Sequence, residues 1–440
     1  MIRLAIESAL TSYWVTCLVR LLFIHQNLPG QYRHLLPYYG QQPGYEVVGL
    51  GEMKWLKQNF RKPVPGVRLI GYDTPPEDKK ATPSILHTTE SAVRRGQSAL
   101  GVLLRLKKTG FYPDVVCAHP GWGETLFLKD VYPRSRLIHY CEFYYHPAGQ
   151  DFNFDPEFPN GAGDILRLRI QNLHHLMALE QADIGIAPTA WQRSRFPGAY
   201  QSKINVVHDG VDTENVAPDP KAFIQLARTN LRLTRADEII TFISRNLEPY
   251  RGFHTLMRAL PDLLKARPKA RVIIIGGNGV SYGRRLAKGN YREKFLAEID
   301  GRFDASRVHF VGRVPYSIML RVLQVSTAHI YLTYPFVLSW SMLEAMAAGC
   351  LVVGSRTSPV EEIIQHGKNG LLVDFFSPQE LVDAVQCVCD EPTKMQSLRE
   401  EARRTIVERY DLKTISLPKQ LTLMEAALSS ELLPASHTPN

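Results

Sequence analysis

The 440-residue sequence lacks several patterns that would assign it to common classes of protein. It contains no run of eighteen apolar residues, so no segment suits a membrane-spanning helix. Its six cysteines have spacings that fit neither a metal site nor a disulfide framework, so free thiols are expected. No two aspartates are separated by a single residue, the spacing that would let them hold a divalent ion against a diphosphate. We therefore expect a globular protein with no metal site.

Acidic residues are outnumbered by basic ones, and the net charge of +9 predicts an anionic partner. No zinc-finger or RNA-binding signature is present, so nucleic acid is not the expected partner. Basic residues gather at 54–62 and 94–108, where they alternate with leucine or tryptophan. Such segments are typical of amphipathic helices with a solvated face, or of weak attraction to an anionic membrane surface.

Short apolar segments alternate with helical patterns along almost the whole chain, which is typical of α/β proteins with parallel sheets. The length suits two domains, and the Asp- and Pro-rich segment 209–220 is expected to link them. The clearest predicted helices span 87–108 and 165–181. The predicted strands are 20–24, 45–50, 67–72, 114–118, 136–140, 183–187, 204–207, 239–244, 271–276, 308–311, 329–332, 351–353 and 371–373.

The most informative segment is 334–373, which predicts a short helix at 341–348 followed by a buried strand. Ser339 and Ser341 can cap this helix, whose first turn then presents backbone N–H groups suited to a phosphate. Glu344 lies one turn further on, where its carboxylate could accept hydrogen bonds from the hydroxyls of a ribose. An ordinary strand–helix–strand unit with a solvent-facing Glu344 would explain the same pattern.

A second candidate site follows the predicted strand 239–244, in the sequence SRNLEPYRGF. Arg245 and Arg251 straddle a proline-containing turn, and their guanidinium groups could clamp a diphosphate with charge-assisted hydrogen bonds. Two surface arginines beside a turn are the alternative. The nearby GGNG at 276–279 also follows a strand, but its glycine spacing does not fit the dinucleotide-binding fingerprint.

Two loops in the first half follow predicted strands, at the edge where α/β sheets bind ligands. Gly30, in HQNLPGQY, permits close approach of the backbone, so this loop could lie against a phosphate or an acceptor. His119, in CAHPGWG, ends its strand beside two glycines. A simple strand-to-helix turn and a hydrogen-bonded structural histidine are the alternative interpretations.

The segment 334–373 resembles the nucleotide-sugar signature of family 4 glycosyltransferases of group 1 type, which are retaining enzymes of the GT-B fold. SPVEEII at 358–364 and GKNGLLV at 367–373 are similar to the family as well. The family has a second glutamate eight residues before Glu344, which normally touches the donor sugar. In this sequence Phe336 takes its place.

The resemblance implies roles for individual residues. Glu344 is expected to bind the nucleotide ribose, and His119 to contact the donor sugar or its surroundings. Arg245 and Arg251 stand close to the places of an arginine and a lysine in the family pattern, although their spacing is one residue longer. Gly277 is expected in a loop near the donor sugar.

The resemblance also implies an architecture of two Rossmann-like domains facing each other across a cleft, the GT-B arrangement. We expect an N-terminal extension at 1–18 and an acceptor-side domain at 19–212. The nucleotide-sugar-binding domain is expected at 213–409. A C-terminal helix and tail at 410–440 should cross back to the first domain.

Together these features predict a cytoplasmic, metal-independent, retaining hexosyltransferase of polysaccharide biosynthesis, with peripheral contact at the inner face of the membrane. It would move a hexose from a nucleotide-diphosphate sugar to a hydroxyl on a glycan or lipid-linked acceptor, with no cofactor. A non-catalytic nucleotide-sugar-binding protein, suggested by Phe336, and a GT-B epimerase are the alternatives. The catalytic candidates are His119, Arg245 and Arg251, and the donor-binding candidates are Gly30, Arg245, Arg251, Gly277, Ser339, Ser341 and Glu344.

Overall fold

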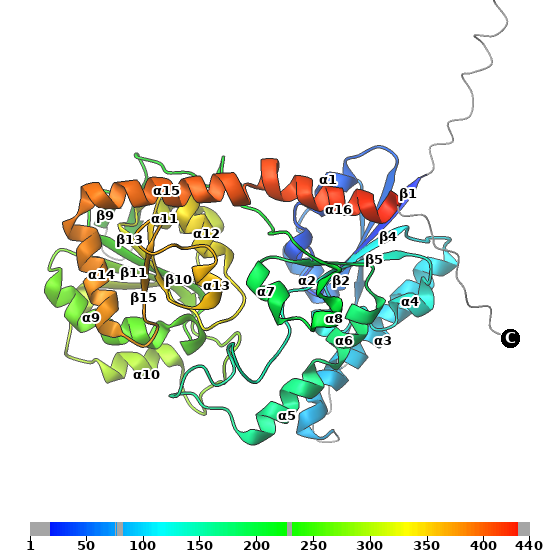
Figure 1. Ribbon diagram of the computed structural model, residues 1–440, viewed down its shortest axis with the longest axis horizontal. Coiled ribbons are helices and arrows are strands. Elements are labelled where there is room, and N and C mark those ends of the chain that lie inside the picture. Colours follow the sequence, from blue (N-terminus) through cyan, green and yellow to red (C-terminus); the bar gives the residue numbers. More distant parts are fainter. Residues whose placement is uncertain (1–17, 75, 77–81, 227–230, 430–440) are drawn as a thin grey trace, which may run out of the picture. The chain divides into compact units, whose positions relative to one another are not determined.

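The computed structural model describes residues 18–74, 76, 82–226 and 231–429 (Figure 1). The expected N-terminal extension lies outside the described residues except for Leu18, and so does the tail from 430 onward. The described residues form two compact units that interleave along the chain. Unit 1 contains those of Met1–Cys141, Ile170–Ile186 and Thr422–Asn440, and unit 2 contains those of Glu142–Arg169 and Ala187–Leu421.

The first sheet has seven strands in the order β3-β2-β1-β4-β5-β6-β7, and β1 to β6 pair in parallel, as predicted. The order of the strands reverses between β1 and β4, which makes their carboxyl ends a topological switch point, where α/β sheets bind ligands. The strands are β1 (Val19–Ile24), β2 (Tyr45–Glu52), β3 (Val67–Tyr72), β4 (Val115–Ala118), β5 (Arg136–Tyr140), β6 (Ile184–Ala187) and β7 (Ile204–Val206).

The helices that accompany the strands of unit 1 include the predicted helix 87–108, which is present in full. The predicted helix 165–181 is interrupted at Asn172, a residue type whose side chain competes for backbone groups and so favours helix ends. The helices are α1 (Leu35–Gly40), α2 (Met53–Asn59), α3 (His87–Lys108), α4 (Leu128–Val131) and α6 (Leu173–Gln181), with short turns η1 (Gly30–Tyr32), η2 (Ser84–Leu86) and η3 (Pro120–Trp122).

Unit 2 contains a six-stranded parallel sheet in the order β12-β11-β10-β13-β14-β15. Its switch point lies between β10 and β13. The strands are β10 (Ile239–Asn246), β11 (Arg271–Gly277), β12 (Val308–Gly312), β13 (Ala328–Tyr331), β14 (Leu351–Ser355) and β15 (Leu371–Val373). The helices are α5 (Ala162–Gln171), α7 (Ala190–Arg195), α8 (Gly198–Gln201), α9 (Phe253–Ala266), α10 (Tyr291–Glu298), α11 (Tyr316–Val325), α12 (Trp340–Ala347), α13 (Ser358–Glu361), α14 (Pro378–Asp390) and α15 (Pro392–Tyr410), with the short turns η4 (Pro249–Arg251) and η5 (Ala305–Arg307).

Sequence analysis missed a two-stranded antiparallel sheet that follows the predicted linker. It pairs β8 (Phe223–Leu226) with β9 (Leu231–Thr234). Each strand buries only one side chain, Ile224 or Leu233. Four-residue strands with so little apolar surface give a weak alternating pattern, which explains why they were not predicted.

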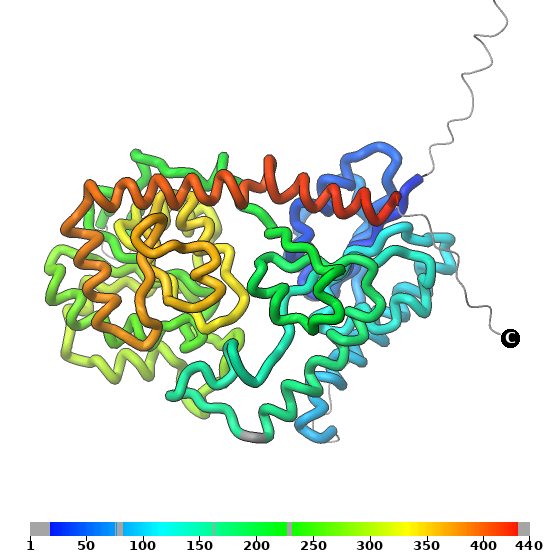
Figure 2. Tube along the Cα trace, in the orientation of Figure 1, coloured from blue at the N-terminus to red at the C-terminus, as the bar shows by residue number. Residues whose placement is uncertain are grey.

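The segment Glu142–Arg169 follows β5 in the chain but packs within unit 2, and its path can be followed in Figure 2. Buried carboxylates hold it there: Tyr250 donates its hydroxyl hydrogen to Asp151 Oδ2 at 2.6 Å, and Tyr334 donates to Asp155 Oδ2 at 2.7 Å. The Nε2 atom of His254 lies 3.1 Å from the same oxygen of Asp155. We call Glu142–Arg169 the clip segment.

The end of the chain is helical, as predicted. A π-helical turn, η6 (Leu412–Ser416), leads into α16 (Leu417–Ser429). Met424 of this helix belongs to unit 1, where its Sδ atom lies 3.1 Å from Cys117 Sγ. The five cysteines within the described residues are free thiols, as expected. None of the helices that the structure describes is long and apolar enough to cross a bilayer.

Replacing Asp155 by alanine should lower the free energy of unfolding by about 3 kcal/mol, because it leaves the buried Tyr334 hydroxyl and His254 without their acceptor. Chemical denaturation of the purified protein measures the loss. The matched control is Asp300→Ala, at an exposed turn, which should change the stability by less than about 0.5 kcal/mol. Equal losses in both variants would contradict a structural role for Asp155.

The same pair of variants tests the pH dependence. Burial opposes the charge of Asp155, but hydrogen bonds from His254 and Tyr334 hold its pKa below the ordinary value. A lowered pKa contributes stability that is present above the unfolded-state pKa, about 4, and is lost as the pH falls through the native value. The difference in stability between wild type and Asp155→Ala should therefore shrink when denaturation is repeated below pH 4.

Candidate functional site

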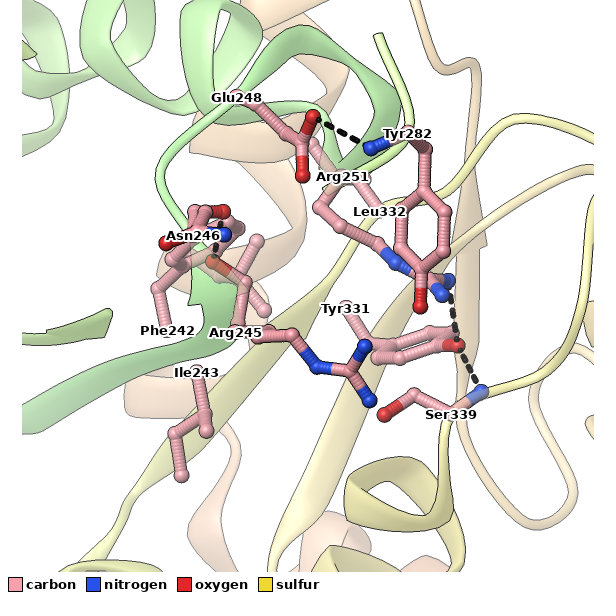
Figure 3. A pocket seen from close by; sticks show the side chains of 12 residues that line it. Phe242, Ile243, Arg245, Asn246, Glu248, Arg251, Tyr282, Tyr331, Leu332 and Ser339 are labelled. Atoms are coloured by element: carbon pink, nitrogen blue, oxygen red, sulfur yellow. Dashed lines mark hydrogen bonds between the residues drawn. The ribbon is translucent and has the colours of Figure 1, made fainter. Parts of the chain in front are cut away.

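A pocket lies at the carboxyl ends of β10 and β13, at the switch point of the unit 2 sheet (Figure 3). Its volume of about 70 Å³ is far below the roughly 300–1,000 Å³ of typical ligand pockets, so it suits one part of a ligand, such as a phosphate. It is lined by Phe242, Ile243, Ser244, Arg245, Asn246, Glu248, Arg251, Tyr282, Ile330, Tyr331, Leu332 and Ser339.

Arg251 places a buried cation beside this pocket. The turn η4 positions it, followed by Gly252 with a φ of 65°, where a Cβ atom would lie 2.2 Å from Leu332 Cβ. Its guanidinium donates hydrogen bonds to Thr333 Oγ1 at 2.7 Å, to the Val337 carbonyl at 3.1 Å and to the Tyr331 hydroxyl at 3.3 Å. All three acceptors are neutral, and no carboxylate of the described residues forms an ion pair with Arg251. The buried carboxylate of Glu248 attracts the Arg251 guanidinium at longer range. A buried cation without a directly paired carboxylate still favours an anionic ligand.

Arg245 differs from Arg251 in being exposed. It lies near the end of β10, and Figure 3 shows its guanidinium directed toward Ser339. No other residue in the described ranges forms a hydrogen bond or ion pair with its side chain. The two arginines predicted to act together thus line one pocket, one fixed by the protein and the other available to a ligand.

Helix α12 begins at the same pocket. Ser339 is its N-cap: its side chain accepts a hydrogen bond from the Ser341 N–H at 3.4 Å, and the two hydroxyl oxygens lie 3.0 Å apart. The Ser339 N–H donates to the Tyr331 hydroxyl at 2.7 Å, and the Trp340 indole donates to Asp209 at 2.7 Å. These bonds fix the start of the helix. Because its N-cap Ser339 lines the pocket, the positive end of the helix dipole lies at the pocket.

Glu344 lies on the second turn of α12 and is only 6% exposed, so it is not solvent-facing. The Tyr316 hydroxyl, at the start of α11, donates to its Oε1 atom at 2.9 Å. The carboxylate of Glu344 therefore already accepts a hydrogen bond from a hydroxyl group of the protein. Its role toward a ribose stays a prediction.

Gly277 ends β11 at a crowded place. A Cβ atom there would lie 2.8 Å from Asn246 Oδ1 and 2.8 Å from Arg313 Nε, so no side chain fits without movement. The Arg313 guanidinium in turn donates to Asn246 Oδ1 at 3.0 Å. Gly277 therefore acts through its lack of a side chain, which leaves room for these polar groups.

Sequence analysis missed Glu248, which anchors the glycine-rich loop after β11. Its buried carboxylate accepts backbone hydrogen bonds from Ser281 at 2.9 Å, Tyr282 at 3.2 Å and Gly283 at 3.1 Å. The Tyr282 ring on this anchored loop stacks near the Arg251 guanidinium, whose Cζ atom lies 5.4 Å from the ring centroid (Figure 3). In the sequence, only the position of Glu248 between Arg245 and Arg251 could have indicated this role.

Phe336, which replaces the family's glutamate, lies in an aromatic cluster. Its ring centroid is 4.6 Å from that of Phe143 in the clip segment, 4.9 Å from Tyr282 and 5.6 Å from Tyr250. The side chain is buried. An apolar group therefore borders the wall that Tyr282 contributes to the pocket.

Gly30 and His119 lie in unit 1, at the carboxyl edge of its sheet. Gly30 has a φ of 50°, and a Cβ atom there would lie 2.4 Å from Nε2 of His25, so its close backbone approach is to that ring. Nε2 of His25 lies 2.7 Å from the Gln31 side-chain oxygen, and burial lowers the pKa of His25 well below its ordinary value. His119 accepts a hydrogen bond at Nδ1 from the Gly121 N–H at 3.1 Å.

The two histidines stand on either side of the switch point, with ring centroids 5.1 Å apart. A further polar pair, missed by sequence analysis, lies in the same unit: Tyr72 donates to Glu124 Oε1 at 2.5 Å. Burial raises the pKa of Glu124, and its Oε2 atom has no hydrogen-bond partner among the described residues. No motif around Glu124 indicated its burial.

Comparison with known families accounts for both halves of the chain. Residues 44–216 match the model of the "Glycosyl transferase family 4 group", and residues 228–405 match "Glycosyl transferases group 1". The chain belongs to the group 1 glycosyltransferases of family 4. The resemblance inferred from Glu344 and the segments around it is confirmed.

Relatives of this glycosyltransferase were found in curated sequences and solved structures. A D-inositol 3-phosphate glycosyltransferase of Corynebacterium urealyticum is 29% identical over 224 residues, which cover 49% of this chain and 51% of that protein. The chain thus spans about half the length of this relative. Sucrose-phosphate synthase of Thermosynechococcus elongatus superposes with a TM-score of 0.71 at 16% identity, covering 94% of this chain and 100% of that one. Anabaena HepE in complex with UDP-glucose gives 0.65 at 17% identity, covering 92% and 99%. The expected fold, two α/β domains of GT-B type, is confirmed.

The different surroundings of the two arginines predict different mutant phenotypes. Arg245→Ala should weaken binding of UDP by about tenfold or more, because a charge-assisted hydrogen bond is lost, and should leave the melting temperature unchanged. Arg251→Ala should weaken binding and also lower the melting temperature, because Thr333, Tyr331 and Val337 lose their donor.

Calorimetric titration with UDP and GDP and thermal unfolding measure the two effects separately. Arg235→Ala, at a half-buried position outside the pocket, is the matched control. Unchanged nucleotide affinity in both pocket variants would remove the arginine clamp from the site.

Proposed function

We propose that this glycosyltransferase moves a hexose from a nucleotide-diphosphate sugar to a hydroxyl acceptor, with retention of configuration and without a metal ion. The observation that carries the proposal is the arginine pair: Arg251 is a buried cation with neutral acceptors, and Arg245 is an exposed one in the same pocket. Both stand beside the capped start of α12 at Ser339. Two guanidiniums and a helix N-terminus supply the positive charge that a metal would otherwise provide.

The donor nucleotide is assigned to unit 2. Its diphosphate would contact Arg245, Arg251 and the helix start at Ser339 and Ser341, and its ribose hydroxyls would donate to Glu344. Gly277 would let the Asn246 and Arg313 side chains meet beside the transferred sugar. The HepE structure contains UDP-glucose, which makes this the first donor to test.

Catalysis in this proposal consists mainly of stabilising the departing diphosphate. The bond between the sugar's anomeric carbon and the diphosphate oxygen breaks, and the acceptor oxygen bonds to that carbon from the same face. The proton of the acceptor hydroxyl passes to the departing diphosphate. Charge grows on the diphosphate in the transition state, where fixed cations are most effective. We assign no enzymic nucleophile.

The acceptor side is assigned to unit 1, where Gly30 and His119 lie at the carboxyl edge of the sheet. A hydroxyl on a glycan or on a lipid-linked sugar is the proposed acceptor. The corynebacterial relative is named for D-inositol 3-phosphate, which is also a hydroxyl-rich compound.

A non-catalytic nucleotide-sugar-binding protein is the second candidate. Phe336 favours it, because an aromatic side chain packed against Phe143, Tyr250 and Tyr282 offers no hydrogen bond to sugar hydroxyls. Phe336→Glu separates the two candidates, since it restores a carboxylate at that place.

The deciding experiment incubates purified protein with UDP-glucose and other nucleotide sugars, over a panel of glycan and lipid-linked acceptors. Transfer by wild type, with the donor's anomeric configuration kept in the product and unchanged activity in a chelator, supports the proposal. NMR of the product determines the configuration. Conversion of the donor without an acceptor would instead indicate an epimerase. Binding without transfer or hydrolysis by wild type, together with activity in Phe336→Glu, would make the wild-type chain a binding protein.

Glu344→Gln should raise the dissociation constant of the nucleotide by about tenfold, because a neutral amide accepts hydrogen bonds from the ribose more weakly than a carboxylate does. The volume is kept, so the melting temperature should change little. The dissociation constants of UDP and 2′,3′-dideoxy-UDP, measured for wild type and variant, form a thermodynamic cycle that isolates the contact between Glu344 and the ribose hydroxyls. If wild type binds both nucleotides equally well, Glu344 does not hold the ribose.

A further inference from the structure

The Glu344 carboxylate is covered in this structure. The residue is only 6% exposed, and it is not among the residues that line the pocket at the start of α12. That pocket, with its volume of about 70 Å³, is also too small for a whole nucleotide. A ribose therefore reaches Glu344 only when a group that covers the carboxylate moves.

Helix α12 itself holds Glu344 in place. The apolar residues on either side of it are fully buried in the hydrophobic core of unit 2, namely Met342, Leu343, Ala345 and Met346. A shift of this helix would expose their side chains to water, which costs free energy in proportion to the apolar area. The movable group must therefore belong to another element.

Tyr316, the first residue of α11, is such a group. Its hydroxyl donates to Glu344 Oε1 at 2.9 Å, yet the residue is 52% exposed. All residues of the segment 315–318 are exposed. Because Tyr316 already faces solvent over half of its surface, rotation of its side chain breaks the bond to Glu344 and disturbs little packing.

We propose that Tyr316 is a gate over Glu344: its hydroxyl occupies the place of a ribose hydroxyl, and the nucleotide binds by exchanging one donor for the other. Both groups are hydroxyls, and either can donate to the same carboxylate oxygen. The nucleotide must compete with Tyr316, so its apparent affinity is scaled by the fraction of molecules in which the gate is open. This inference rests on the proposed ribose role of Glu344.

The gate also distinguishes between ligands. A nucleotide without the ribose hydroxyls gains no hydrogen bond when Tyr316 leaves Glu344, so it has no differential affinity for the open state. Opening is therefore linked to the ribose hydroxyls and not to the diphosphate, which the arginine pair would bind in either state.

Tyr316→Phe tests the gate, because it keeps the ring and removes the competing donor. The probes are UDP or GDP, whichever wild type binds more tightly, and its 2′,3′-dideoxy analogue. In calorimetric titration the variant should bind the ribonucleotide more tightly than wild type by about threefold or more, because a competing hydrogen bond to a charged group is lost. The affinity for the dideoxy analogue should change by less than about twofold. The matched control is Tyr112→Phe, at a 53% exposed tyrosine of unit 1, which should leave both affinities unchanged.

Movement of the gate can also be observed directly. Replacement of Tyr316 by 3-fluorotyrosine in the full chain gives one ¹⁹F resonance. At saturation this resonance should shift with the ribonucleotide and stay close to its position in the free protein with the dideoxy analogue.

Each of three results would overturn the gate. Weaker binding of the ribonucleotide by Tyr316→Phe would show that the hydroxyl supports the ligand instead of competing with it. Equal tightening for both nucleotides would show that release of Tyr316 does not depend on the ribose hydroxyls. Unchanged affinity for the ribonucleotide would show that the two hydroxyls do not compete. These results leave the ribose role of Glu344 intact, whereas equal binding of both nucleotides by wild type would overturn that role together with the gate.

Discussion

The nucleotide site depends on one buried charge. Arg251 is fixed in a low-polarity environment by a hydroxyl from Thr333, a hydroxyl from Tyr331 and the Val337 carbonyl, none of which neutralises it. Several neighbouring features serve its position: the left-handed Gly252, the Tyr282 ring and the Glu248 carboxylate that anchors that ring's loop. Glu248 attracts Arg251 at longer range, and an anionic ligand would supply the directly paired counterion that Arg251 lacks among the described residues. The affinity for an anionic ligand therefore depends directly on the buried charge of Arg251.

Most of the fold was predictable from the sequence because parallel strands are buried on both faces. The segments 67–72, 136–140 and 371–373 form the predicted strands with the same bounds. The last is wholly apolar and buried, and the first two are mainly apolar with one or two polar residues. The prediction failed where burial is slight or local. The hairpin β8–β9 buries one side chain per strand, and a single Asn172 divides the helix expected at 165–181.

The candidate site was predictable only in part. Arg245, Arg251 and Ser339 stand in recognisable motifs at strand and helix ends, and the structure brings them into one pocket. Glu248 and Glu124 could not be found in this way, because their roles depend on backbone groups or on a tyrosine distant in the sequence. The clip segment illustrates the same limit, since its carboxylates meet Tyr250 and Tyr334 about one hundred or more positions away.

The clip segment also constrains how the chain is assembled during synthesis. Phe143 belongs to the hydrophobic core of unit 2, yet it emerges from the ribosome about a hundred residues before β10, the first strand of that sheet. Until Tyr250 and Tyr334 arrive, its buried carboxylates Asp151 and Asp155 have no hydroxyl donors. Conversely, a fragment that starts after the linker lacks part of its own core. The two units are thus not separable modules. Each is built from segments separated in the sequence, so neither unit can fold fully from one continuous stretch of the chain.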